Sequence, residues 1–256
     1  MKLEDLGSKA DRLLGLIPVE RIATVDITRT PKDLIDRLLT LEGITATISD
    51  ILDSLGLQGV VPASVLKPLV SGRKIAGNAV TLRYIPEQET PTQLHNNRVR
   101  AKLADRDVYA IAEEGDVAVF DANGMADIST MGGLSALMAT KAKMSGNIID
   151  GGIRDLDVIR SLNYPVWSRG GTPRTGKHRL EAIEINGPVI CAGIQVQPGD
   201  LVVADDTGVV FVPADRAVEV IEQALAMVEK EDKLIEAIKQ GASISEIKKI
   251  LSPDKW

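Results

Sequence analysis

Cysteine and aromatic residues are scarce in this sequence of 256 residues, and each scarcity excludes a class of protein or site. A single cysteine, Cys191, rules out an internal disulfide and a cysteine-rich zinc site. Its neighbours Val189, Ile190 and Ala192 are apolar, so we expect a buried thiol rather than a nucleophile. Aromatic residues make up only 3% of the chain while hydrophobic residues make up 44%, so the expected core is mostly aliphatic.

Long apolar runs and blocks of one charge are also missing. No run approaches the roughly 20 apolar residues that span a bilayer, and the acidic start is unlike a signal peptide. The 30 basic and 36 acidic residues are mixed along the chain, without the basic stripe that is typical of nucleic-acid binding. We therefore predict a cytoplasmic protein that contacts neither membranes nor nucleic acid directly.

The centre of the chain alternates glycine turns with short regular segments. Residues 134–144 are rich in alanine, leucine, methionine and lysine, which favours a helix that begins after Gly132. Residues 147–150 are short and apolar, as in a buried strand. Apolar residues then recur every three positions from Leu156, which indicates a second helix beginning near Asp155. The amino termini of these two helices are predicted to converge.

The residues at this convergence suit an anionic ligand and a metal ion. Helix amino termini present unpaired amides and a partial positive charge, so they attract anions. Arg154 adds a guanidinium that can hold a carboxylate through two hydrogen bonds. Asp155 offers an oxygen ligand to a hard cation such as magnesium. The pattern predicts a site where a small carboxylated substrate meets a metal.

A short internal repeat indicates the fold class. Residues 115–124 and 199–208 each contain Gly-Asp, four apolar residues, an acid, and a glycine three residues later. Two such copies predict two strands at comparable positions in one sheet core. With the helical segments around them, the pattern predicts a single α/β domain with mixed strands and peripheral helices.

The ends of the chain are predicted to be helical. We place the domain at residues 41–256, with a long helix near its end, and interpret residues 1–40 as an appended helical extension. Thr30 and Pro31 form a typical helix start, with a capping residue followed by proline. Ser49-Asp50 is predicted to begin the next helix.

At residues 150–155 the sequence Asp-Gly-Gly-Ile-Arg-Asp, preceded by Gly-Gly-Leu from Gly132, resembles the RraA-like family. That family includes the divalent-metal 4-hydroxy-4-methyl-2-oxoglutarate aldolases and the RraA regulators of ribonuclease E. The likeness runs from about residue 47 to the C-terminal helix. It implies a layered β/β/α (swivelling-type) core with mixed sheets, assembled as a homotrimer or homohexamer with sites between subunits.

The resemblance also implies roles for individual residues. Arg154 and Asp155 would be catalytic, and Asp155 would hold Mg²⁺ or Mn²⁺. Glu231, with Glu229 in reserve, matches an acid that reaches the metal of a neighbouring subunit through water. The substrate carboxylate would be held by Arg154 and by the backbone amides of Gly133, Leu134 and Ser135.

The chain departs from the family at Gly133, where an acid usually follows the glycine that opens the central helix. In the aldolases that acid is thought to move a proton to or from metal-ordered water. The change therefore bears on aldol cleavage more than on ligand binding. Asp127, six residues earlier, is the predicted replacement.

Two functions follow. The first is a divalent-metal-dependent lyase that cleaves a C–C bond of a small 2-oxo acid through a pyruvate enolate, as an aldolase, an oxaloacetate decarboxylase, or both. Arg169 or Lys177 could meet the far end of such a substrate, although an ordinary surface-loop role is the favoured alternative for each. The alternative is a non-catalytic regulator that binds a protein partner such as a ribonuclease, or a related lyase acting on a different sugar-acid-like substrate.

Overall fold

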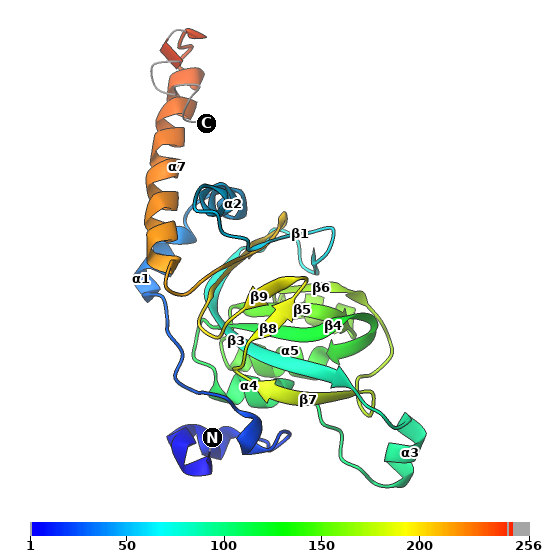
Figure 1. Cartoon of the computed structure of the whole chain (residues 1–256). Helices are drawn as coiled ribbons and strands as arrows, with labels where there is room; N and C mark the ends of the chain where they lie inside the picture. The colour runs from blue at the N-terminus through cyan, green and yellow to red at the C-terminus, as the bar shows by residue number, and fades with distance from the viewer. Residues whose placement is uncertain (1, 245, 248–256) are drawn as a thin grey trace.

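The chain, described by a computed structural model at residues 2–244 and 246–247, folds around a nine-stranded mixed sheet with helices on both sides (Figure 1). The helical segments are η1 (Leu3–Arg12), η2 (Val19–Arg21), α1 (Lys32–Leu38), α2 (Ile44–Ser54), α3 (Pro91–Asn96), α4 (Asp105–Ile111), α5 (Gly133–Lys141), α6 (Leu156–Ser161) and α7 (Ala217–Lys239). The strands are β1 (Val60–Pro62), β2 (Lys67–Pro68), β3 (Ile75–Pro86), β4 (Val117–Met131), β5 (Gly146–Ile153), β6 (Val166–Gly171), β7 (Leu180–Ile185), β8 (Val189–Cys191), β9 (Ile194–Val196), β10 (Leu201–Asp205) and β11 (Gly208–Val212).

Strand β3 joins the two halves of the sheet because its length lets it pair with different neighbours. Its first residues, 75–78, pair antiparallel with β10, and residues 79–83 pair parallel with β4. On the β4 side, β4, β5 and β6 run parallel to one another, whereas β10, β11 and β1 form an antiparallel meander. The mixed sheet and layered α/β fold implied by the family resemblance are confirmed.

Three apolar cores hold the layers together. The first lies between the parallel strands and α4, α5 and α6, and contains Phe120 and Ile149. The second lies between the two halves of the sheet and the β8–β9 hairpin, and contains Trp167 and the buried Cys191. The third joins β10 and β11 to α1, α2 and α7 through residues such as Ile221. No helix in the described ranges is long and apolar enough to cross a membrane.

The internal repeat corresponds to two strands that flank β3 on either side, β4 and β10, as predicted. Each copy begins with the same turn. The Asp116 carboxylate accepts a hydrogen bond from the backbone N–H three residues earlier, at 2.8 Å, and Asp200 does the same at 2.7 Å. The glycines before them have φ of 91° and 94°, a left-handed conformation that favours glycine. The repeated sequence therefore determines the turn by which the chain enters each strand, and not the chemistry of a site.

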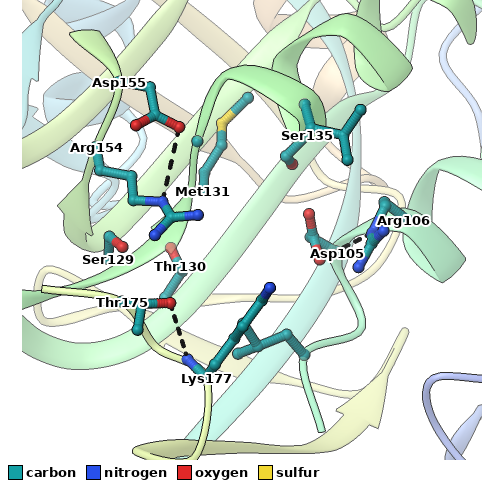
Figure 2. A pocket seen from close by; sticks show the side chains of 13 residues that line it. Asp105, Arg106, Ser129, Thr130, Met131, Ser135, Arg154, Asp155, Thr175 and Lys177 are labelled. Carbon is teal, nitrogen blue, oxygen red and sulfur yellow. Dashed lines mark hydrogen bonds and ion pairs between the residues drawn. The ribbon is translucent and has the colours of Figure 1, made fainter. Parts of the chain in front are cut away.

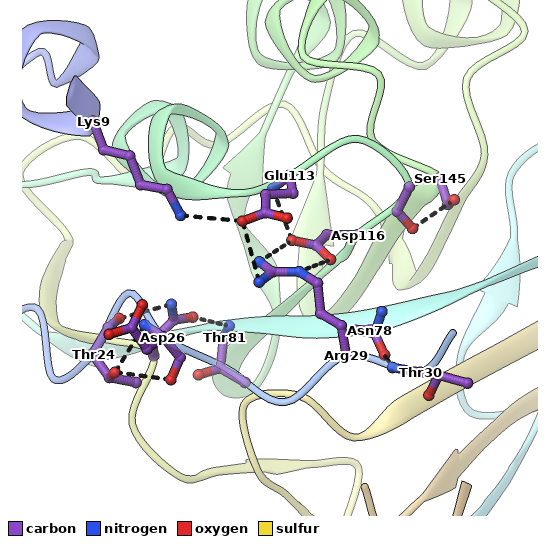
Figure 3. A network of polar contacts seen from close by, with 12 residues as sticks. Lys9, Thr24, Asp26, Arg29, Thr30, Asn78, Thr81, Glu113, Asp116 and Ser145 are labelled. Carbon is purple, nitrogen blue, oxygen red and sulfur yellow. Dashed lines mark hydrogen bonds and ion pairs between the residues drawn. The ribbon is translucent and has the colours of Figure 1, made fainter. Parts of the chain in front are cut away.

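The N-terminal segment packs on the helix layer of its own chain. Short helical turns are joined by extended chain, and Leu6, Ile17 and Ile22 are buried in the first core. Arg29 holds the segment at the buried Asp116 carboxylate, with a contact of 3.0 Å, and Lys9 lies 3.6 Å from Glu113 (Figure 3). The end of the predicted domain, residues 248–256, lies outside the described residues.

Both predicted helix starts near this segment are wrong. Helix α2 begins at Ile44, directly after Gly43 with its φ of 59°, so Ser49 and Asp50 lie inside the helix. Thr30 does not cap α1, because the capping position falls on Pro31 and the Thr30 hydroxyl has no partner among the described residues. Its N–H instead donates to Asn78 Oδ1 at 2.8 Å, which fixes the segment to β3 (Figure 3).

Candidate active site

A cavity of about 130 Å³ lies at the carboxyl ends of β4 and β5, between α4, α5 and α6 (Figure 2). Ligands of parallel α/β sheets bind at this end of the strands. A cavity of about 150 Å³ can hold a molecule the size of benzene, so this one suits a small organic acid. Its lining includes the charged side chains of Asp105, Arg106, Arg154, Asp155 and Lys177 and the hydroxyl of Ser135.

The two predicted helix amino termini meet in this cavity. Asp155 adopts a left-handed conformation, with φ of 54°, that turns the chain from β5 into α6. Its Oδ2 accepts a hydrogen bond of 3.0 Å from the N–H of Gly133, the first residue of α5. The Arg154 Nε lies 3.6 Å from the same oxygen (Figure 2). The predicted convergence is confirmed, because Asp155 Oδ2 contacts both the first amide of α5 and the side chain of Arg154.

Gly132 permits this close approach. A Cβ atom at position 132 would lie 2.6 Å from Asp155 Oδ2, closer than real Cβ contacts, and 3.1 Å from Arg154 Nε, closer than most of them. Its φ of −145° is open to any residue, so space rather than backbone conformation requires glycine. The Gly-Gly-Leu motif therefore serves to bring α5 against the Arg-Asp pair.

Gly133 is closely covered by a neighbour on α6. A Cβ atom at position 133 would lie 2.7 Å from Val158 Cγ1 and 3.0 Å from Val158 Cβ. The acid that the family resemblance implies at position 133 is thus absent, and Val158 takes the space next to it. Position 133 could accommodate an acidic side chain only if Val158 moved or were replaced by a smaller residue.

Replacing Gly133 by alanine should therefore destabilise the fold, although alanine is the better helix former by about 1 kcal/mol. Overpacking against Val158 is expected to outweigh that gain by about 1–2 kcal/mol. In the double variant Gly133→Ala/Val158→Ala the 2.7 Å contact with Cγ1 disappears and only the 3.0 Å contact with Cβ remains, so the coupling between the two sites should exceed about 1 kcal/mol. Urea unfolding of the four proteins in this cycle measures the coupling. Additive effects would mean that Val158 does not restrict position 133.

A buried hydrogen-bond chain fixes the direction of the Ser135 hydroxyl. Tyr164 donates to Asn147 Oδ1 at 2.7 Å, and Asn147 Nδ2 donates to the Tyr109 hydroxyl at 3.0 Å. Burial raises the pKa of both tyrosines, so they keep their protons. The Tyr109 proton is then left for Ser135 Oγ, 3.0 Å away. Ser135 can therefore direct its own proton to Asp105 or to a ligand.

Asp105 is a site residue that the sequence analysis missed. It begins α4, is only 5% exposed, and lines the cavity opposite Arg154 (Figure 2). Burial raises the pKa of its carboxyl, while contact with Ser135 and the charge of Arg106 act in the opposite direction. An acid in the first turn of a helix is an ordinary stabilising feature, so its position in the sequence gives no sign of this role.

The cavity carries more positive than negative charge. Arg106, Arg154 and Lys177 line it, against the carboxylates of Asp105 and Asp155. Lys177, one of two candidates for the far end of a substrate, lines the cavity. The other candidate, Arg169, is engaged elsewhere.

Arg169 and Asp150 form a structural ion pair outside the cavity lining. The Arg169 Nε donates to Asp150 Oδ1 at 2.6 Å, and Ala192 N–H donates to the other oxygen at 2.8 Å. Asp121, on the neighbouring strand, accepts a hydrogen bond from Ile190 N–H at 3.2 Å. These contacts fix the β8–β9 hairpin to the sheet.

Two other predicted residues lie away from the cavity. Asp127 is 68% exposed and pairs with Arg174 at 2.6 Å, because the register of β4 against β5 shifts repeatedly after Asp121. The structure therefore does not bring Asp127 to the position of the missing acid. Glu231 is exposed and lies C-terminal to the last buried residue of α7, Ala224. The C-terminal part of this helix projects beyond the body of the chain (Figure 1). Glu229, the reserve for Glu231, pairs with Lys233 at 2.8 Å.

The cavity suits a magnesium ion that keeps most of its water. Among the described residues there is no group of three or more histidine, cysteine, aspartate or glutamate side chains that could enclose a metal. Magnesium commonly takes one or two carboxylates, with water and substrate oxygens as its other ligands. The contacts of the Asp155 carboxylate described above both use Oδ2, which leaves Oδ1 for a cation.

Comparison with known proteins agrees with this architecture. The chain is 33% identical to Protein DlpA of Legionella pneumophila over 85% of its own length, and spans about a third (33%) of DlpA. It is 32% identical to a protein of Halalkalibacterium halodurans named as a candidate 4-hydroxy-4-methyl-2-oxoglutarate aldolase, covering 70% of this chain and 77% of that protein. The crystal structure of Streptomyces coelicolor RraAS2, described as an unusual member of the RNase ES inhibitor RraA protein family, is 31% identical with a TM-score of 0.67, covering 80% of this chain and 96% of RraAS2.

The match to a known family covers most of the cavity and the sheet that carries it. Residues 45–211 match the RraA-like family, described as Aldolase/RraA. The matched range contains the Gly-Gly-Leu segment, the Arg-Asp pair and Asp105, and it leaves out the N-terminal segment and α7. The chain therefore belongs to the RraA-like family.

Proposed function

We propose that this chain is a divalent-metal-dependent lyase that cleaves a carbon–carbon bond of a small 2-oxo acid. The observation that carries the proposal is the meeting of Arg154, Asp155 and the amino terminus of α5 in one cavity. An anion-binding arginine beside an available carboxylate oxygen suits a substrate that presents a carboxylate and a metal-binding keto oxygen together. The candidate aldolase of H. halodurans supports this reading.

Each residue has a role in the proposed reaction. The amide of Gly133, one of the three predicted to bind the substrate carboxylate, is instead used by Asp155. Arg154 and the amides of Leu134 and Ser135 orient the substrate carboxylate, and Asp155 would hold Mg²⁺ or Mn²⁺. When bound, the metal supplies Lewis-acid stabilisation of negative charge that develops on substrate oxygens. Asp105, with its raised pKa, takes the proton of the substrate hydroxyl in an aldol cleavage and returns one to the pyruvate carbon. Lys177 meets the second carboxylate of the substrate.

Pyruvate release from oxaloacetate and from 4-hydroxy-4-methyl-2-oxoglutarate tests the proposal. We expect turnover with magnesium or manganese, its loss in EDTA, and its loss in Asp155→Ala. Asp157→Ala is the matched control, because Asp157 is an exposed acid two residues further along α6. Absence of turnover on both substrates in folded protein would contradict the lyase.

Replacing Asp105 by asparagine is expected to lower activity and to change how the stability of the protein depends on pH. We expect kcat to fall about 10²-fold, because the amide cannot transfer a proton. The raised pKa means that the folded protein holds this proton more tightly than the unfolded chain, so the wild type loses stability as pH rises from the usual 3.8 through the raised value. Asparagine does not ionise, so the unfolding free energy of the variant should rise relative to that of the wild type between about pH 4 and about pH 7.

Urea unfolding at these two pH values measures that difference, with activity assayed at the higher one. Asp157→Asn, on the surface of α6, is the control and should change neither quantity appreciably. A difference in unfolding free energy between the wild type and Asp105→Asn that does not depend on pH would contradict the assigned ionisation of Asp105.

The proposal includes a homotrimer or homohexamer in which Glu231 completes the site of a neighbouring subunit. Two surfaces support it. Leu134 and Leu137 on α5, beside the cavity, are 63% and 52% exposed. On the projecting part of α7, Ile235 and Ile238 are 47% and 52% exposed. Apolar side chains gathered on exposed helices are typical of association surfaces.

Mixing two inactive variants tests the shared site. Arg154→Ala and Glu231→Ala proteins are dissociated in mild denaturant, mixed and reassembled. If each site takes Arg154 from one subunit and Glu231 from the next, mixed oligomers contain some intact sites and activity returns. Each variant treated alone is the control. Activity that does not return in oligomers shown to be mixed would contradict the assignment of Glu231.

A second function, regulation of a ribonuclease, is favoured by the identity to S. coelicolor RraAS2. In that case the exposed helices would bind the partner protein, and the cavity residues would be dispensable. Inhibition of an RNase E-type enzyme by the wild type, and equally by Arg154→Ala, would support the regulator. Metal-dependent turnover without such inhibition would support the lyase.

A further inference from the structure

A second cavity lies at the opposite end of the parallel strands from the candidate active site. Its volume is about 380 Å³, within the usual range for small-molecule sites. The turn before β3 contributes Arg73 and Lys74, the segment after α5 contributes Met144, and the turn before β6 contributes Asn163 and Tyr164. These residues lie at the amino ends of the strands, so the cavity shares no lining residue with the first.

The charged groups of this lining are both cations. Arg73 and Lys74 belong to it, and none of its residues is acidic. Lys74 has one acidic neighbour, Glu42 at 3.8 Å, whose side chain is 99% exposed and therefore well screened by solvent. The cavity thus keeps two positive charges without a buried counter-charge.

The Arg73 guanidinium has an unused buried donor. Its NH2 donates to the Asn163 carbonyl at 2.9 Å, which holds the side chain in place. Its Nε is buried and has no hydrogen-bond partner among the described residues. The buried Nε is out of reach of a ligand, but the contact with Asn163 uses only one of the N–H groups on the two terminal guanidinium nitrogens, so the others can bind a carboxylate or phosphate oxygen.

The hydroxyl groups of the lining are already committed. The hydroxyl of Thr140 donates to the Ala136 carbonyl at 2.8 Å, and that of Ser145 donates to the Gly115 carbonyl at 2.9 Å. Tyr164 donates to the Asn147 side chain at 2.7 Å. These hydroxyls have no proton left for a ligand, so the donors that remain belong to the two cations and to the side-chain amide of Asn163. Recognition there depends on ligand charge.

The rest of the wall is apolar and comes from the ends of four elements. It consists of Leu39, Ile75, Ala76, Met144, Leu162 and Pro165. Such a surface binds the apolar body of a ligand while the cations bind its anionic end.

We propose that this cavity is a second ligand site, which binds a small organic anion with one carboxylate or phosphate group on an apolar body. Arg73 binds the anionic group through the terminal guanidinium N–H groups that Asn163 does not use, and Lys74 supplies the second positive charge. The site is separate from the lyase reaction, because Arg73 and Lys74 take no part in that reaction.

Calorimetric titration with benzoate tests this site, with benzamide as the uncharged probe of the same shape. We expect saturable benzoate binding by the wild type and at least tenfold weaker binding of benzamide. Arg73→Met should weaken benzoate binding at least tenfold. Arg154→Ala, in the first cavity, should leave it unchanged. Phenyl phosphate and inorganic phosphate then distinguish a phosphate ligand from a carboxylate, and a substituted anion from the anion alone.

Two further variants make the result decisive. Arg12→Met removes an exposed arginine of η1 and should bind benzoate as the wild type does. If Arg73→Met melts well below the wild type, Lys74→Met provides the second measurement and should also weaken binding. Loss of benzoate binding in Arg154→Ala but not in Arg73→Met would place the anion in the first cavity and overturn the proposal. Absence of benzoate binding by the wild type would overturn it as well.

Discussion

Arg154→Ala is expected to lower kcat/KM for pyruvate release by about 10³-fold, the upper range for removing one preorganised donor. The guanidinium is held beside Asp155, with its Nε 3.6 Å from the carboxylate, so it is already oriented before substrate arrives. Its loss removes the group that grips the substrate carboxylate. It also leaves Asp155 without its neighbouring positive charge.

Arg154→Lys distinguishes charge from shape. Lysine keeps the positive charge but lacks the planar fork that binds a carboxylate through two hydrogen bonds, so we expect a fall of about 10²-fold. Arg174→Ala is the matched control, because Arg174 is an exposed arginine near the cavity that pairs with Asp127. Its activity should stay within about threefold of the wild type. Comparable losses in both alanine variants would indicate a general electrostatic effect rather than a specific grip.

The features predicted correctly from the sequence depend on contiguous residues. A glycine that opens a helix, and an Arg-Asp pair between a strand and a helix, carry their geometry in the local chain. The meeting of Gly133 N–H with Asp155 Oδ2 follows once the two helix starts are placed. The repeated Gly-Asp turn predicted the strands beside β3 for the same reason.

The features that were missed depend on helix phase and on distant packing. Asp105 and Asp107 lie two residues apart in one helical segment, and nothing in their local sequence tells them apart. Two residues correspond to a rotation of about 200°, so their side chains leave α4 on nearly opposite sides. One side faces the cavity and the other faces the N-terminal segment, an arrangement that only the tertiary fold decides. The wrong placement of Asp127 has a similar origin, because the register shifts of β4 depend on its partner strand.

Asp107→Ala is expected to destabilise the protein by about 3–4 kcal/mol, a large effect for one substitution. The Asp107 carboxylate is fully buried and accepts three backbone hydrogen bonds from the N-terminal segment. The donors are the N–H groups of Leu14 at 2.6 Å, Leu16 at 2.5 Å and Ile17 at 3.2 Å. Alanine leaves these donors without an acceptor, and each unsatisfied buried donor carries a desolvation cost. For a chain of this size the melting temperature should fall by about 10 °C.

Hydrogen exchange and thermal unfolding together measure this loss. Amides near residues 14–17 should lose protection first, because they are the groups that Asp107 binds. Asp11→Ala, an exposed acid on the same segment, is the control and should change the unfolding free energy by less than about 0.5 kcal/mol. A variant that melts like the wild type would mean that other contacts, such as Arg29 with Asp116, hold the segment without Asp107.

The same variant decides whether the N-terminal segment serves the site. Asp107 lies one residue beyond Arg106 and two beyond Asp105, so the segment is attached to the turn of α4 that carries two cavity residues. Oxalate, a small dicarboxylate, serves as a probe of the candidate active site. If the attachment positions Asp105 and Arg106, folded Asp107→Ala should bind oxalate severalfold more weakly at a temperature well below its melting point. If affinity is unchanged while stability falls, the segment stabilises α4 without shaping the cavity. Because oxalate affinity is measured without turnover, the result holds whichever reaction the cavity performs.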